Sequence, residues 1–274
     1  MGEMYRLLAL DLDGTLLRSD GHVDARDAAA IHELRAAGVT VTIATGRLHS
    51  GAMAAAQATG IQGAIACAEG SHIVDVASRR WLAHHPMNSE VTEVLRDVFS
   101  SYPLASFVFE ADGIHYDEAG ERFAGYVRTW SPNLGLVGEA LDAEVWRNDP
   151  IAAIAIGEQD AVTAAHRALR GRAELFSIAF AIASHPGKHA ILTRAAGPTK
   201  GTALAALCAE AGCTVADAVA IGDWFNDIPM FEVAGRSFAM ASAPGPVRQK
   251  ATDALDSVAG AGGGIAEAIA RAWG

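Results

Sequence analysis

Three short, largely apolar runs that end at polar residues constrain the fold of this chain more than any other feature. Leu7–Leu10 runs into Asp11, Val39–Ala44 into Thr45, and Ala218–Ile221 into Gly222 and Asp223. Such runs are typical of strands buried on both faces, as in a parallel sheet. Helical patterns at 24–37 and 200–211 lie between strands, and such units require right-handed crossovers. The sequence therefore predicts a doubly wound α/β core, to which 61–66 and 72–76 are expected to add further strands.

The pattern changes between residues 85 and 196. Residues 89–99 and 160–169 have helical periodicity, and 106–116 is expected to form a hairpin with Asp112-Gly113 at its turn. Further strand patterns follow, which is typical of an α+β lobe with helices on one face of a sheet. We therefore predict a core made of residues 1–84 and 197–274, with residues 85–196 inserted as a separate domain.

Charge argues against a nucleic-acid partner. The 274 residues include 21 basic and 32 acidic side chains, which gives a formal net charge of −11, and no Lys/Arg run occurs. Nucleic-acid binders derive most of their affinity from neutralising phosphates with basic side chains. The chain is therefore expected to bind small molecules, which need only a few cations or a metal ion gathered in one cleft.

The cysteines and apolar segments indicate a cytoplasmic protein. Cys67, Cys208 and Cys213 form no CxxC pair, and their odd number does not favour a disulfide framework. Such usage suits a reducing compartment. We find no signal peptide pattern before Asp11 and no apolar run long enough to span a bilayer, so no membrane association is expected.

Four polar clusters carry the chemistry that the sequence predicts. They are Asp11-Leu12-Asp13-Gly14-Thr15, Thr45-Gly46-Arg47, Lys200-Gly201 and Gly222-Asp223-Trp224-Phe225-Asn226-Asp227. Three of them follow predicted strands and Lys200 opens a helix. Ligands of open parallel sheets bind beyond the carboxyl ends of the strands. We therefore expect the four clusters to meet at one edge of the sheet.

Phosphoryl transfer explains these residue types. Asp11, Asp223 and the backbone carbonyl of Asp13 can supply the oxygen ligands that Mg²⁺ prefers. The second oxygen of Asp11 can attack phosphorus to form an aspartyl-phosphate, while the Asp13 carboxyl protonates the leaving oxygen and later accepts a proton from water.

The remaining polar residues are assigned to the phosphate and to support. Thr45 and Lys200 are expected to bind the transferring phosphoryl oxygens. Gly46 and Asn226 are placed in the same phosphate site, and Asp227 is expected to orient Lys200 or metal-bound water. Arg47 fits equally well as a structural ion-pair partner and as a substrate contact.

The order and spacing of the four clusters resemble the signatures of haloacid dehalogenase-type phosphatases. The resemblance covers nearly the whole chain, and Ala44-Thr45-Gly46-Arg47 is similar to the second motif of the Cof-like (IIB) branch. It implies a Rossmann-like doubly wound parallel sheet, an inserted cap domain closing over the site, Mg²⁺, and small phosphorylated substrates such as sugar phosphates. One position departs from the branch. Its usual Asn-Gly-Ala is replaced by Glu69-Gly70-Ser71, and a carboxylate there is expected to alter the electrostatics near the substrate.

Two other functions use the same residues to different extents. A phosphomutase would need the same first half-reaction and would return the phosphoryl group to the sugar. A non-catalytic metabolite sensor would have no need of a nucleophile and an acid together, so intact Asp11 and Asp13 disfavour it. A dehalogenase would need neither Mg²⁺ nor Asp13. Hydrolysis of a phosphomonoester is the function that the sequence favours.

Overall fold

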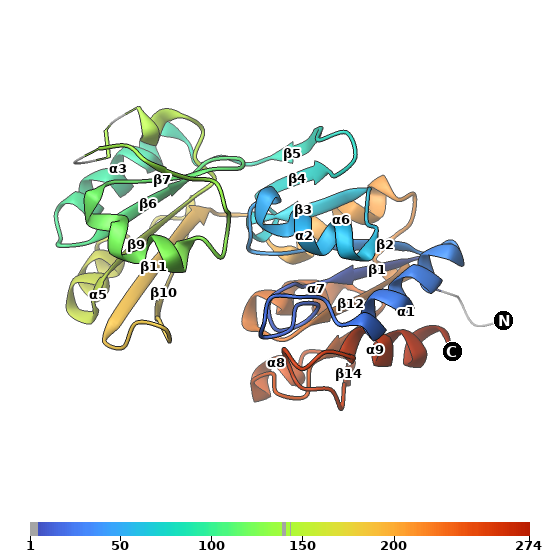
Figure 1. The fold of residues 1–274 in the computed structure, drawn as a ribbon. Coiled ribbons are helices and arrows are strands. Elements are labelled where there is room, and N and C mark those ends of the chain that lie inside the picture. The colour runs from blue at the N-terminus through green and yellow to red at the C-terminus, as the bar shows by residue number, and fades with distance from the viewer. Residues whose placement is uncertain (1–4, 139–140, 143) are drawn as a thin grey trace. The chain divides into compact units, whose positions relative to one another are not determined.

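The computed structural model describes residues 5–138, 141–142 and 144–274, and these residues form two compact units (Figure 1). Unit 1 consists of Met1–Gly46, Ala52–Ala83 and Pro198–Gly274, and unit 2 of Arg47–Gly51 and His84–Gly197. The first unit is thus built from chain segments on both sides of the second.

A five-stranded parallel sheet, in the order β14-β13-β12-β1-β2, forms the centre of unit 1 (Figure 1). Its strands are β1 (Leu7–Leu10), β2 (Thr40–Ile43), β12 (Ala218–Gly222), β13 (Arg236–Ala239) and β14 (Asp253–Ala254). Leu10 pairs with Ile43 on one side and with Ile221 on the other. The carboxyl ends of β1, β2 and β12 therefore lie at one edge of the sheet.

Helices cover both faces of this sheet, which confirms the doubly wound core. They are α1 (Ala25–Ala36), α2 (His49–Thr59), α6 (Lys200–Glu210), α7 (Ile228–Val233), α8 (Gly245–Arg248) and α9 (Gly264–Trp273). Leu8 and Leu10 pack into one apolar cluster with residues of α1, α2 and α9. Leu7 and Ala9 point the other way and pack with residues of α6 and α7. Alternating side chains of β1 are buried on opposite faces, which explains its continuous apolar run.

Residues 61–76 differ from the expectation that they extend the parallel sheet. Unit 1 contains a second, three-stranded sheet in the order β3-β4-β5, made of β3 (Ala64–Cys67), β4 (His72–Asp75) and β5 (Trp81–His84). β3 and β4 pair antiparallel. A single parallel bridge, Ala44 to Ala66, joins β3 to the end of β2. The prediction was wrong for β4, because only four residues separate it from β3, which is too short for a parallel crossover.

Unit 2 is an α+β structure around a six-stranded sheet in the order β10-β11-β9-β6-β7-β8. Its strands are β6 (Ala105–Phe109), β7 (Ile114–Tyr116), β8 (Leu134–Leu136), β9 (Ala152–Glu158), β10 (Leu175–Ala181) and β11 (Lys188–Ala195), and its helices α3 (Ser89–Ser100), α4 (Ala124–Val127) and α5 (Gln159–Ala168). β6 and β7 form the predicted hairpin around Asp112-Gly113. Residues of α3 and α5 pack with the sheet in one apolar cluster.

Short 3-10 turns complete both units. They are η1 (Ala68–Gly70), η2 (Glu118–Phe123), η3 (Val145–Arg147), η4 (Val215–Asp217) and η5 (Phe225–Asp227). The first and last of these follow strands of unit 1, where they shape the site described below. None of the helices in the described ranges has the combination of length and apolar character that crossing a bilayer requires.

Asp27 joins the first and last helices of unit 1. Its side chain is fully buried in α1 and accepts hydrogen bonds from the backbone N–H groups of Gly263 and Ala266, each at 2.8 Å. Gly263 is the N-cap of α9 and has no side chain to accept these bonds. Asp27 therefore caps a helix that lies more than two hundred residues away along the chain.

We predict that Asp27→Ala lowers the free energy of unfolding by about 1 to 3 kcal/mol, because two buried N–H groups lose their acceptor. Urea denaturation followed by circular dichroism measures this change. Glu33→Ala, which removes an exposed acid from the same helix, is the matched control. Equal stability of the two variants would contradict the capping role.

Candidate active site

Asp11 lies directly beyond the carboxyl end of β1, a strand that pairs with β12 on one side and β2 on the other. Its N–H donates to the carbonyl of Ile221 at 3.0 Å, so the main chain continues the sheet pairing for one residue beyond the strand. Only 5% of the residue is exposed. The carboxylate of Asp11 is thereby held at the strand end that the sequence predicts.

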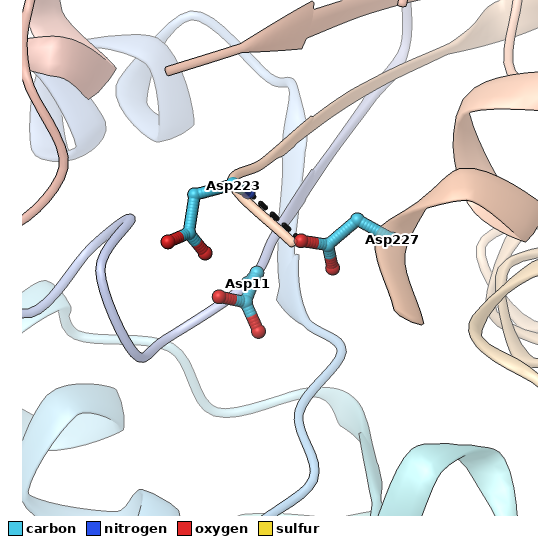
Figure 2. A group of neighbouring side chains, drawn as sticks. All are labelled: Asp11, Asp223 and Asp227. Atoms are coloured by element: carbon cyan, nitrogen blue, oxygen red, sulfur yellow. Dashed lines mark hydrogen bonds between the residues drawn. The ribbon is translucent and has the colours of Figure 1, made fainter. Parts of the chain in front are cut away.

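Three carboxylates meet at this point. Asp11 follows β1, Asp223 follows β12, and Asp227 lies at the end of η5 (Figure 2). One carboxylate oxygen from each residue lies within 4.8 Å of the others. Three neighbouring negative charges in a largely buried place repel one another unless cations lie between them.

Lys200 supplies one cation. It is the first residue of α6, whose N-cap is Thr199. Its ammonium group donates to Oδ1 of Asp11 at 2.5 Å and to Oδ1 of Asp227 at 2.6 Å, and its side chain is fully buried. A lysine in the first turn of a helix is disfavoured by the helix dipole, so these two carboxylates, and not the helix, account for its position.

Asp227 uses both carboxylate oxygens within the protein. Oδ1 accepts from Lys200, while Oδ2 accepts from the backbone N–H groups of Asp223 and Trp224 at 2.8 and 2.9 Å (Figure 2 draws the first of these). It fixes the loop that carries Asp223 and orients the lysine ammonium. Asp11 and Asp223 are therefore left as the carboxylates best able to take an external ligand.

The proton affinities of these groups reflect their burial. Desolvation, followed by repulsion from Asp227, raises the pKa of Asp223 to about 6. Desolvation also raises the pKa of Asp11, although Lys200 opposes the shift. For Lys200 burial disfavours the charge, but the attraction of Asp11 and Asp227 outweighs it and raises the pKa of the ammonium. Negative charge is thus costly at Asp11 and Asp223, and an added cation would relieve that cost.

The loop after β1 brings two further residues against Asp223. Gly14 has a φ of +83°, and any Cβ at this position would collide with the Asp223 carboxylate. The hydroxyl of Thr15, which is 2% exposed, donates to Oδ1 of Asp223 at 3.4 Å. Sequence reasoning gave Thr15 no role. Its place directly after the Asp-x-Asp-Gly turn was the signal that could have indicated one.

The donor set fits a hard divalent cation. Asp11 and Asp223 offer carboxylate oxygens, which Mg²⁺ and Ca²⁺ prefer over nitrogen or sulfur ligands. No histidine or cysteine belongs to the acidic cluster in the described residues. The raised pKa values of both aspartates give the same indication, because a bound cation stabilises the charged form.

The other predicted site residues include Asp13, Thr45 and Arg47. Asp13 is exposed, and its negative charge helps to raise the pKa of Asp223. Thr45 is 1% exposed and follows β2, with its N–H donating to Ala66 at 2.9 Å. Arg47 belongs to unit 2, where it donates to the carbonyl of Gly51 at 3.2 Å.

Glu69 lies between Asn226 and Gly46, although sequence reasoning assigned it no role in catalysis. The amide Nδ2 of Asn226 donates to Oε1 of Glu69 at 2.9 Å. The same oxygen lies 2.6 Å from where a Cβ on Gly46 would be. The second and fourth polar clusters are thus linked by Glu69. The signal in the sequence was the departure from Asn-Gly-Ala at this position.

Comparison with known proteins identifies the family. The profile of the haloacid dehalogenase-like hydrolases matches residues 8–269. A protein named HMP-PP phosphatase from Yersinia enterocolitica is 29% identical over 258 residues, which cover 90% of this chain and 88% of the relative.

Solved structures show the same fold. A haloacid dehalogenase-like hydrolase from Bacteroides thetaiotaomicron has a TM-score of 0.82 at 22% identity, covering 97% of this chain and 99% of that one. A sugar phosphatase of HAD subclass IIB has a TM-score of 0.78 at 16% identity, covering 97% and 98%. As the four motifs indicated, the chain belongs to the haloacid dehalogenase-like hydrolase family.

Proposed function

We propose that this protein is a Mg²⁺-dependent phosphatase that hydrolyses small phosphorylated metabolites through an aspartyl-phosphate on Asp11. The observation that carries the proposal is the contact of Lys200 with Asp11, beside the carboxylate of Asp223. A nucleophilic carboxylate, a fixed cation and a second acidic ligand in one place are the components that phosphoryl transfer requires.

In the first half-reaction Asp11 attacks the phosphorus atom of the ester. A bond forms between a carboxylate oxygen of Asp11 and phosphorus, and the bond from phosphorus to the ester oxygen breaks. Asp13, which is exposed and close to Asp223, gives its proton to the departing oxygen. The ammonium of Lys200 attracts the phosphoryl oxygens as negative charge develops on them, and Thr45 and Asn226 donate hydrogen bonds to them.

In the second half-reaction water attacks the same phosphorus atom. Asp13, now ionised, takes a proton from this water, and the bond from phosphorus to Asp11 breaks. Inorganic phosphate leaves and both aspartates return to their starting states. Asp227 also accepts a hydrogen bond from Lys200, so the ammonium group stays in place when Asp11 loses its negative charge in the intermediate.

The cation proposed for the acidic cluster is Mg²⁺. Asp11 and Asp223 would hold it through carboxylate oxygens, together with the backbone carbonyl of Asp13. When bound, it neutralises part of the charge on the phosphate ester, which would otherwise repel the attacking carboxylate. Mg²⁺ is favoured because it retains several waters and needs few protein ligands.

We propose that the inserted segment, residues 85–196, which makes up most of unit 2, acts as the cap domain that selects the leaving group. Its segment His84–Gly197 lies between the second and third motifs in the sequence and folds as an α+β unit of its own. Two of the proteins compared above are named as an HMP-PP phosphatase and as a sugar phosphatase. We infer a substrate of that class, a small phosphorylated metabolite.

We predict that Asp11→Asn lowers kcat for p-nitrophenyl phosphate by at least about a thousandfold, since the amide is a poor nucleophile. Phosphate release in the presence of MgCl2 or EDTA measures the effect, and EDTA should abolish the wild-type rate. The control is Asp20→Asn, an exposed acid after the same motif. A variant at Asp11 that keeps a tenth of the activity would exclude it as nucleophile. Transfer of the phosphoryl group to a sugar instead of to water would indicate a mutase.

The raised pKa of Asp223 predicts a pH-dependent metal affinity. With a pKa of about 6, the ionised fraction falls from about nine tenths at pH 7 to about one tenth at pH 5, so Mg²⁺ should bind about tenfold more weakly at pH 5. The pKa of Asp223 in the folded protein lies above its ordinary value of 3.8, so this group binds a proton at a higher pH in the metal-free native state than in the unfolded chain. The contribution of Asp223 to the stability of the metal-free protein therefore becomes more favourable as the pH falls from 7 towards 4.

Thermal unfolding with and without MgCl2 at pH 5 and pH 7.5 tests both statements. Added Mg²⁺ should raise Tm at pH 7.5 and have little effect at pH 5, and Asp223→Asn should remove most of the Mg²⁺ effect at pH 7.5. The variant should also be more stable than the metal-free wild type at pH 7.5. An equal rise in Tm at both pH values would show that Asp223 is not a ligand.

A further inference from the structure

Glu69 lies in a strained turn beside the site. It follows β3 within η1, where Ala68, Glu69 and Gly70 have φ values of +47°, +59° and +93°. Non-glycine residues rarely adopt these backbone angles, and such strain persists where the surrounding structure holds the backbone in place. The turn is held by a hydrogen bond from the Glu69 N–H to the carbonyl of Thr45 at 3.0 Å.

The turn directs the Glu69 carboxylate onto the phosphate-binding residues. Oε1 accepts from Asn226 at 2.9 Å and lies directly over the backbone of Gly46. Because a carboxylate can only accept, the amide nitrogen of Asn226 must face it, which determines how this side chain is oriented. A larger residue than glycine at position 46 would displace the carboxylate.

The charge of Glu69 also acts on Lys200. Burial disfavours the ammonium, and the carboxylates of Asp11, Asp227 and then Glu69 raise its pKa. Three residues proposed to bind the phosphoryl group, Gly46, Lys200 and Asn226, therefore surround or face this one carboxylate. A phosphate dianion bound there would be repelled by Glu69, since two like charges in a partly buried site interact strongly.

We propose that Glu69 is a positioning residue that orients Asn226 and lowers the affinity of the site for the phosphate dianion. Its hydrogen bond fixes the amide, and its charge offsets part of the attraction of Lys200. Inorganic phosphate is consequently held loosely after hydrolysis. The inference rests on the proposed function for the location of the phosphoryl group.

The test measures binding of inorganic phosphate, with MgCl2 at pH 8, by isothermal titration calorimetry. Glu69→Gln keeps the shape and an acceptor for Asn226 but removes the charge, so Kd should fall roughly three- to tenfold. The difference from wild type should shrink in 1 M salt, because screening weakens charge repulsion. Glu69→Ala should bind more weakly than Glu69→Gln, because Asn226 loses its acceptor. Glu33→Gln, an exposed acid on α1, controls for net charge and should bind as wild type does.

The outcomes separate this inference from the proposed function. Unchanged or weaker phosphate binding in Glu69→Gln, or a difference that salt does not reduce, would overturn the role of the Glu69 charge. No detectable binding to either protein would overturn it too. Phosphate binding can be measured without turnover. If the wild-type protein hydrolysed no ester but Glu69→Gln still bound phosphate more tightly, the proposed hydrolysis would be refuted and the electrostatic role of Glu69 would remain supported.

Discussion

The buried contact of Lys200 with Asp11 and Asp227 is the interaction on which the rest of unit 1 depends. A fully buried ammonium group is stable only because two carboxylates accept hydrogen bonds from it, at 2.5 and 2.6 Å. Removing one partner of a buried ion pair typically costs about 3 to 5 kcal/mol, because a charge is left uncompensated. Asp11 follows β1, Lys200 begins α6 and Asp227 ends η5, so their charges hold together segments far apart in the sequence.

The same charges that join these segments make the site reactive. Asp11 and Asp223 have raised pKa values because they are buried among other carboxylates. A structure optimised for stability alone would avoid such crowding, and strained or repulsive groups commonly gather at functional sites. In this protein the repulsion is located where a cation and a phosphate ester are proposed to bind. Burial of apolar side chains in the sheet, whose strand β1 is buried on both faces, offsets the free-energy cost of this repulsion.

Periodicity predicted those elements whose side-chain pattern is set by burial. The parallel strands β1, β2 and β12 and the helices α1 and α6 are found where apolar runs and helical periodicity indicated them. Strands whose pairing partners lie far away, or that are very short, were missed. β5, β8 and β14 were not predicted, and β4 pairs antiparallel with β3 instead of extending the parallel sheet. A short apolar run does not specify its partner, because pairing direction depends on loop length and on the space left by other elements.

The sequence by itself determined the residue types of the site, because Asp11, Lys200 and Asp223 each follow a strand end or open a helix in a recognisable order. It also determined the parallel core, since short, continuous apolar segments are typical of parallel strands buried on both faces. Only the tertiary structure decided what each polar atom contacts. That Asp227 uses both oxygens internally, that Asp27 caps a distant helix, and that Glu69 lies over Gly46 follow from three-dimensional packing. Hydrogen bonds between residues far apart along the chain leave no periodic signal in it.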